Sequence, residues 1–465
     1  MHFFIPRNLR TEPRCGNIYF EKIMKNVPAF QLKPMTSGHG RTAVLAREVV
    51  LLFAVLAISV ISAEFAHWFR EIIIRTVELI YGNSKSTVAV FTSNRWKVFF
   101  VVVAVVVVAR YSAIAANKIG KGRLGFSYIS HAPSEEEERK GGISLGGTLM
   151  RSFGIFAVSI GASSIGREAA ILETCGALGH SLGKKLWNAG PVIASAGIAA
   201  AFAGAYHAPI GGIIYVFGHA RSWRSKRSLA YAAIGAAISY FFTVHEFGNR
   251  PIFAIKIQSV HAMFILGLIG LIPAIVGSRL LLELRDRAAK RHLVRLHPVA
   301  SSILMIVIAA ACVSLSPLTA GNGMEAIRTA AVSFTVWVGI ALALTKMLAI
   351  VATIGSRAPG GVFAPTLSVS AGWALLTFIA LHNLGVPLPG SYWDGMVVAM
   401  SVGVAVGLQS PLLGMVVVAE MTGQIQFIPV IAVIVFLAIQ INKVVDKQVM
   451  SRTHRLPSIF QDQDA

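Results

Sequence analysis

The chain has 465 residues, of which 55% are apolar and only 14% are charged, and its formal net charge at pH 7 is +21. A soluble domain carries about 25% charged residues, so this composition excludes an ordinary soluble globular protein. Most basic residues lie between apolar segments, which favours the positive-inside asymmetry of a membrane protein over nucleic-acid binding. The cysteines, at Cys15, Cys175 and Cys312, are too scattered to form a disulfide or metal framework.

The first 41 residues are basic and contain neither an early apolar core nor a small-residue cleavage site. They predict a cytoplasmic tail rather than a signal peptide. Several of the uncharged runs that follow reach the roughly 17–25 residues that a helix needs to cross a bilayer. The uncharged runs, not all of which are that long, cover residues 49–63, 262–278, 299–323, 329–345, 358–393 and 395–419. We therefore expect one all-α polytopic membrane domain over residues 42–445 and a short cytoplasmic tail over residues 446–465.

Basic residues cluster in two loops, within residues 221–227 and 285–295. Cytoplasmic loops of membrane proteins are enriched in lysine and arginine, so we expect both loops on the cytoplasmic side. Residues 228–242 and 260–282 then cross outward and back, and residues 243–259 face outside. The expected location is the cell (inner) membrane, with both termini cytoplasmic.

Glycine and proline repeatedly interrupt the apolar segments. Broken helices at membrane depth are tolerated only where protein or a watery cavity surrounds them, and secondary transporters build ion sites from them. The stretches HAPIGGIIYVFG at 207–218 and QSPLLGMVVVAE at 409–420 share a proline, a glycine three residues further on and an aliphatic run. Gly166 and Gly361, each near an expected helix start, are separated by nearly the same number of residues as these two stretches. These pairs predict two related halves, each rich in half-helices.

Arg167 and Glu168 stand side by side in ASSIGREAAILETCGALG, at 162–179, among small and apolar residues. A helix from Glu168 to about Gly183 would begin with unpaired N–H groups and a partial positive charge. Such an end can hold a carboxylate or a small anion from solution. The alternative is that Glu168 only favours a helix start and Arg167 pairs with another acid, such as Glu173. The cost of burying charge in a membrane favours the functional interpretation.

The stretch GREAA at 166–170 resembles the G-[KR]-E-G-P motif of the CLC chloride channel and transporter family, and APGGVFAP at 358–365 matches its G-x-F-x-P motif. Two further stretches match the paired helix regions of the two halves of that family. They are HAPIGG at 207–212, and QSPLLG at 409–414 with the later Glu420-Met421-Thr422. The resemblance covers about residues 47–453. It implies a homodimer with a separate anion pathway in each subunit, built from inverted halves with many tilted and broken helices.

The resemblance also implies the site. Glu168 corresponds to the external gate, and the backbone N–H groups of Arg167, Glu168, Val362 and Phe363 would bind the anion. Gly361 lets the backbone approach an ion closely, and Phe363 would form an apolar wall. The transported ligand would be chloride or a similar small inorganic anion, and no cofactor or bound metal is expected.

Three departures from the family pattern stand out. The family's G-S-G-I-P loop corresponds to residues 120–124, so Lys121 and Gly122 occupy the anion-binding loop and a lysine replaces the coordinating serine. Lys121 would either strengthen anion binding or extend toward water. The family's C-terminal tyrosine is not found, and the alignment places Asp446 or a neighbour there. The exchangers' proton-transfer glutamate falls at His219, which is either a proton relay or a structural residue at a helix end.

We therefore expect a voltage-gated-type chloride channel with a glutamate gate, and as the alternative a proton-coupled chloride antiporter of the same family. An organic-anion transporter is a more distant alternative, since only Arg167 and Lys121 are candidate basic residues for a roomy cavity. A zinc protease is disfavoured because Asn249 stands where the second histidine of H-E-x-x-H is required. The protein is not expected to be an enzyme.

Overall fold

The computed structural model describes residues 39–123, 141–220, 223, 225–249, 251–255, 257–289, 297–330 and 334–453. Across these residues the regular structure is helical, apart from a single bridge between Gly166 and Gly361. The expected all-α fold class is confirmed. The expected N-terminal tail up to residue 38, the last residues of the C-terminal tail and parts of both basic loops lie outside the described residues.

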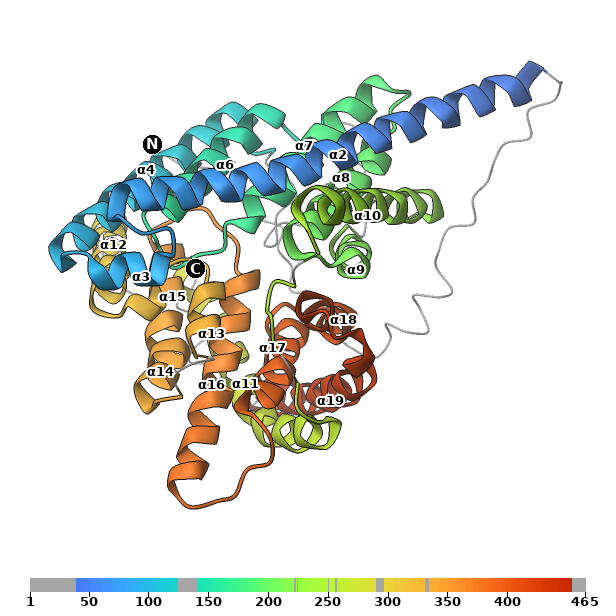
Figure 1. Cartoon of the computed structure of the whole chain (residues 1–465). Helices are drawn as coiled ribbons and strands as arrows, with labels where there is room; N and C mark the ends of the chain where they lie inside the picture. The colour runs from blue at the N-terminus through green and yellow to red at the C-terminus, as the bar shows by residue number, and fades with distance from the viewer. Residues whose placement is uncertain are drawn as a thin grey trace.

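The first half of the chain forms eight described helices up to residue 247 (Figure 1). They are α2 (His39–Tyr81), α3 (Ser86–Thr92), α4 (Arg95–Gly120), α6 (Leu145–Ile160), α7 (Glu168–Lys185), α8 (Gly190–Tyr206), α9 (Pro209–His219) and α10 (Lys226–Phe247). The long α2 runs across α7 and α8 and contacts both. Helix α8 also packs against α7, α9 and α10, so it lies at the centre of this half.

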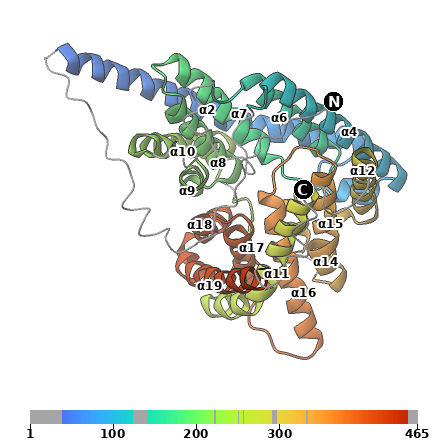
Figure 2. The same cartoon turned by 180° about the vertical axis from the view of Figure 1, so that it is seen from behind.

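The second half begins with α11 at Val260 and is also helical. Its α-helices are α11 (Val260–Ala289), α12 (Pro298–Leu315), α13 (Met324–Ala330), α14 (Val336–Ile340), α15 (Lys346–Gly355), α16 (Phe363–Asn383), α17 (Tyr392–Gly407), α18 (Pro411–Thr422) and α19 (Ile428–Thr453). A π-helical turn, Ala341–Thr345, joins α14 to α15. Helix α17 packs against α11, α16, α18 and α19 (Figure 2). Helix α19 continues past residue 445, where we expected the membrane domain to end.

Helix length and hydropathy place much of this fold in a membrane. Eight candidate spans among the described residues are long and apolar enough to cross a bilayer. Five apolar helices are shorter, at 10–17 residues, and they are α6, α8, α9, α17 and α18. The mixture of full-length and short apolar helices confirms the expectation of a polytopic protein rich in half-helices.

The expected repeat is visible in the backbone. His207 and Gln409 both adopt left-handed conformations, with φ of 54° and 52°, two residues before the prolines that open α9 and α18. Ala162 and Arg357, with φ of 57° and 70°, likewise precede the starts of α7 and α16. Left-handed conformations are uncommon outside glycine. Their recurrence at matching places therefore indicates that the two halves share one local chain path.

Neighbouring helices are joined by hydrogen bonds to a carboxylate and by close packing at a small residue. Glu420 on α18 accepts hydrogen bonds from the N–H groups of Ile210 and Gly211, at 2.9 and 2.7 Å, at the start of α9. Helices α9 and α18 therefore lie against each other, as both views of the fold show. At Gly197 on α8, a Cβ atom would lie 2.7 Å from the Cys175 carbonyl oxygen of α7. Small residues at such crossings allow membrane helices to pack closely.

Candidate functional site: two helix N-termini and a buried glutamate

The N-termini of α7 and α16 meet through their preceding glycines. The N–H of Gly166 donates to the carbonyl of Gly361, and the N–H of Gly361 donates to the carbonyl of Gly166, both at 2.8 Å. The approach requires glycine, because a Cβ atom on Gly166 would lie 2.8 Å from the Gly361 carbonyl oxygen. The free N–H groups and partial positive charges of two helix ends from different halves therefore converge on one place.

Glu168 is the first residue of α7, where the sequence predicted the helix to begin. Its side chain is buried in the residues that the structure describes, and Oε1 accepts a hydrogen bond from the Nδ2 of Asn322. The Nε of Arg167 lies 3.9 Å from the same oxygen. The second oxygen, Oε2, has no hydrogen-bond partner among the described residues. The carboxylate is thus held by one oxygen and left free at the other.

Asn322 belongs to a loop that is held in place by the buried side chain of Lys346. The Nζ of Lys346, fully buried at the start of α15, donates to the carbonyls of Thr319 and Gly321 at 2.8 and 2.6 Å. The N–H of Gly321 in turn donates to the carbonyl of Ala162 at 2.9 Å. Lys346 therefore fixes the segment that holds Glu168. Neither Asn322 nor Lys346 was predicted from the sequence, although an isolated lysine after a long apolar run is a recognisable signal.

Aromatic side chains line the site beside α16. Phe363, the first residue of α16, is buried, and its ring lies 4.7 Å from the ring of Tyr206 and 5.6 Å from that of Phe202. The Phe202 ring continues the cluster to Tyr215 at 5.2 Å. Phe363 therefore belongs to a buried aromatic cluster at the start of α16, next to the N-cap residue Val362.

Two further guanidinium groups lie around Arg167 and Glu168. Arg70 on α2 and Arg328 on α13 interact electrostatically with Arg167, and Arg70 also interacts with Glu168. Arg328 is oriented by its Nε, which donates to the carbonyl of Ile252 at 3.1 Å. Positive charge gathered from three separate elements raises the local concentration of anions.

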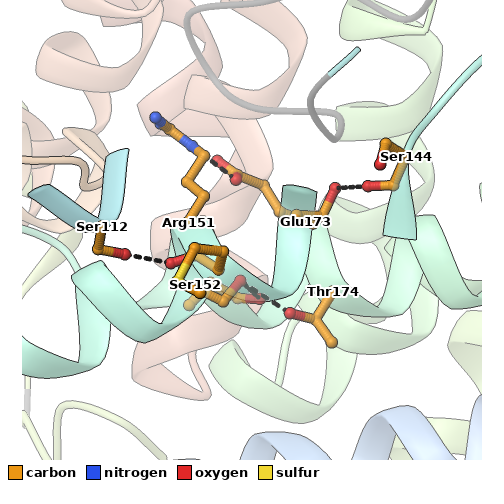
Figure 3. A network of polar contacts seen from close by, with 9 residues as sticks. Ser112, Ser144, Arg151, Ser152, Glu173 and Thr174 are labelled. Atoms are coloured by element: carbon orange, nitrogen blue, oxygen red, sulfur yellow. Dashed lines mark hydrogen bonds and ion pairs between the residues drawn. The ribbon is translucent and has the colours of Figure 1, made fainter. Parts of the chain in front are cut away.

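Glu173, which the alternative interpretation offered as one example of an acid partner for Arg167, pairs with a different arginine. The fully buried Glu173 accepts a hydrogen bond from the Nε of Arg151 on α6 at 2.8 Å (Figure 3). The hydroxyls of Ser152 and Thr174, 2.9 Å apart, join the same two helices alongside this ion pair. The pair therefore fastens α7 to α6.

Lys121 and Gly122 are exposed and lie at the C-terminal end of α4, unlike the buried residues around Glu168. Lys121 is the left-handed C-cap residue, and its N–H donates to carbonyls of the last helical turn. Asp446, which itself or through a neighbour is aligned with the family's C-terminal tyrosine, forms an ion pair with Arg279 of α11 at 2.8 Å. The structure thus brings together Glu168, Arg167, Gly361, Val362 and Phe363, but shows no hydrogen bond or ion pair from Lys121 to Glu168 within the described residues.

His219 ends α9 and is buried. Its ring stacks on Tyr215 with 4.4 Å between ring centroids, and its Nδ1 lies 3.0 Å from the Tyr215 carbonyl oxygen. His219 is therefore connected through Tyr215 to the aromatic cluster at Phe363. Among the described residues, no group of three or more histidine, cysteine and acidic side chains is arranged to hold a metal ion.

The fold and the site together define a multi-pass membrane protein in which the N-termini of α7 and α16 meet beside a buried carboxylate. Comparison with protein families is consistent with this class: residues 100–443 match the model described as "Voltage gated chloride channel". The match covers most of the chain, so the protein belongs to that family, the CLC family that its motifs resemble. Members of this family transport anions and are not enzymes.

Named relatives agree with the assignment. The chain is 28% identical over 357 residues to the "Voltage-gated ClC-type chloride channel ClcB" of Salmonella typhimurium, covering 72% of this chain and 81% of the relative. It is 29% identical over 292 residues to a "Putative chloride channel protein ClcB-like" of Ralstonia nicotianae, covering 59% and 67%.

Solved structures confirm the fold. A slow cyanobacterial Cl⁻/H⁺ antiporter matches with a TM-score of 0.66 at 16% identity, covering 87% of this chain and 99% of that chain. A CLC-type fluoride/proton antiporter matches with a TM-score of 0.60 at 15% identity, covering 84% and 95%.

Proposed function

We propose that this protein conducts chloride or a similar small inorganic anion between the N-termini of α7 and α16, with Glu168 as the gate. The observation that carries the proposal is the Gly166–Gly361 bridge, which joins two helix N-termini beside a buried carboxylate with one free oxygen. Helix N-termini bind anions through backbone N–H groups and dipoles. The N–H groups of Arg167, Glu168, Val362 and Phe363 are the proposed ligands.

The gate follows from competition for the same place. As a carboxylate, Glu168 occupies the helix ends as a transported anion would and excludes it by charge. Protonation removes that charge and weakens the hold on the site, so anions pass. Transport is therefore expected to rise as external pH falls. No cofactor takes part in this scheme.

We favour passive, channel-like conduction, because His219 occupies the position where the resemblance to exchangers requires a carboxylate. The ClcB relatives named above also carry the word channel in their names. Proton-coupled exchange is the second candidate, since His219 is a buried titratable group stacked on Tyr215 in the cluster that reaches Phe363. Loss of chloride-driven proton uptake in His219→Ala, with uptake present in the wild type, would favour exchange through His219.

The test is anion efflux and internal pH recorded together from liposomes under a chloride gradient. Glu168→Gln, which imitates the protonated form, is expected to conduct with little pH dependence and no proton coupling. Glu168→Asp, with a shorter reach, should alter gating and keep a pH response. Glu246→Gln is the matched control, because that side chain is 48% exposed and pairs with its neighbour His245 on the surface.

Two outcomes contradict the proposal. If Glu168→Gln keeps the wild-type pH curve, Glu168 is only a helix-start residue. If an organic anion leaves the liposomes and chloride does not, the protein is an organic-anion transporter. Uphill proton movement driven by chloride indicates exchange, and efflux without proton movement indicates a channel.

We further propose a homodimer in the cell (inner) membrane with both termini cytoplasmic. The orientation rests on the basic loops at residues 221–227 and 285–295. Labelling of single cysteines placed next to these loops by a membrane-impermeant reagent tests it. Reaction from outside intact cells contradicts the orientation, and cross-linked mass in membranes tests the dimer.

A further inference from the structure

Tyr206 is a buried tyrosine whose hydroxyl has no hydrogen-bond partner in the part of the chain that the structure describes. Its side chain is 2% exposed, and the hydroxyl is unpaired within the residues that the structure describes. Buried tyrosine hydroxyls usually find a partner. Tyr81 follows this rule, with its hydroxyl donating to the Gly161 carbonyl at 3.2 Å, and so does Tyr231, which donates to Glu48 at 2.6 Å. An unpaired buried donor is costly, so Tyr206 requires an explanation.

The position of Tyr206 places this hydroxyl at the anion site. Its ring packs against Phe363, the first residue of α16, with 4.7 Å between centroids and a tilt of 51°. The hydroxyl also interacts electrostatically with Glu168 and Arg167 at the start of α7. Tyr206 is the last residue of α8, and the left-handed His207 and the proline opening α9 fix where it lies. It therefore stands beside both converging helix N-termini.

A donor without an acceptor in such a place is suited to an anion. The Oε2 of Glu168 is the complementary group, an acceptor that receives no hydrogen bond from the described residues. When Glu168 leaves the helix ends, the Tyr206 hydroxyl is available to the incoming anion. The two positions where the resemblance would place hydroxyl ligands do not provide them, because Lys121 is an exposed lysine and Asp446 pairs with Arg279.

We propose that the Tyr206 hydroxyl is a direct ligand of the transported anion, donating a hydrogen bond to a halide bound between the N-termini of α7 and α16. This inference rests on the proposed function, since it assigns a further ligand to the same site. A single O–H donor added to backbone N–H groups suits a small, monovalent, spherical anion. Hydrogen bonds to charged groups contribute more free energy than hydrogen bonds between neutral groups. The Tyr206 hydroxyl should therefore strengthen chloride binding by a measurable amount.

The experiment measures chloride binding to the full-length protein in detergent by isothermal titration, together with chloride-dependent thermal stabilisation. Tyr206→Phe is expected to bind chloride roughly tenfold more weakly or worse, while folding as well as the wild type in chloride-free buffer. Tyr81→Phe is the matched control, because it removes a buried hydroxyl that is already bonded to a carbonyl, and its chloride affinity should not change. Incorporating 3-fluorotyrosine at 206 keeps the packing and strengthens the donor, so chloride should bind more tightly.

The outcomes separate this inference from the proposed function. Equal chloride affinity in wild type, Tyr206→Phe and the fluorinated protein overturns the role of Tyr206, even where liposome efflux supports anion conduction. Chloride binding that depends on Tyr206 in a protein that gives no efflux supports the ligand and overturns the proposed function. A wild-type protein that binds no chloride overturns both.

Discussion

Replacing Asn322 with alanine should open the gate. The Nδ2 of Asn322 donates the one side-chain hydrogen bond that the structure gives to Glu168 within the described residues, while Arg167 stands 3.9 Å away. A hydrogen bond to a charged acceptor contributes about 1.5–3 kcal/mol, which corresponds to a shift of about 10- to 100-fold in an equilibrium. Asn322→Ala should therefore raise anion efflux at neutral pH by up to that factor and flatten its dependence on pH.

The assay is initial chloride efflux from liposomes across a pH series for wild type, Asn322→Ala, Glu168→Gln and the double variant. If Asn322 acts through the carboxylate, its replacement has little further effect once Glu168 is glutamine. Asn322→Asp serves as the control for the helix cap, because Asn322 also accepts a bond from the N–H of Met324 at 3.2 Å and aspartate keeps that acceptor. Wild-type efflux at every pH in Asn322→Ala and in Asn322→Asp would refute this reasoning.

Three further predictions concern residues around the site. Arg151→Met should lower the free energy of unfolding in detergent by about 3 kcal/mol or more, because it leaves the buried Glu173 without its cation. Adding Glu173→Gln should restore most of the lost stability. Equal stability of the single and double variants would contradict this prediction. Lys346→Met should cost about 2 kcal/mol in the same measurement and also raise efflux, since the carbonyls of the Asn322 loop lose their donor; unchanged efflux would separate the loop from the gate. Lys121→Ser should change the order of chloride, nitrate and fluoride fluxes more than their total, and an unchanged order would leave Lys121 as a water-facing side chain.

The start of α7 could be predicted because its signal is local. Arg167 and Glu168 stand in an apolar setting after a glycine, and a carboxylate at a helix N-terminus is electrostatically favoured. The correspondence between Gly166 and Gly361 could also be predicted, since a duplicated chain repeats its helix starts at a fixed interval. The bridge between these glycines gives that interval a physical meaning: both segments need close backbone contact, so both keep a residue without a side chain.

Asn322, Lys346 and Tyr206 could not be predicted in the same way, because their roles depend on contacts between distant segments. Asn322 is separated from Glu168 by 154 positions, and its asparagine looks like an ordinary turn residue in sequence. Tyr206 looks like one more aromatic residue at the end of an apolar helix. Only packing against Phe363 and the missing partner of its hydroxyl reveal it as a polar group in the site. The partner of Glu173 could not be predicted for the same reason, since nothing local in the sequence distinguishes Arg151 from Arg167.

The reciprocal pair of hydrogen bonds between Gly166 and Gly361 also constrains how the protein can move. Many secondary transporters change access by rocking one half against the other. Here such a motion would separate the two halves at the site itself and leave four backbone groups unpaired in an apolar setting, at a cost of about 1–3 kcal/mol for each. We therefore expect the Gly166–Gly361 junction to stay fixed during transport. Access to the site would then be controlled by movement of the Glu168 side chain rather than by a hinge motion between the two halves.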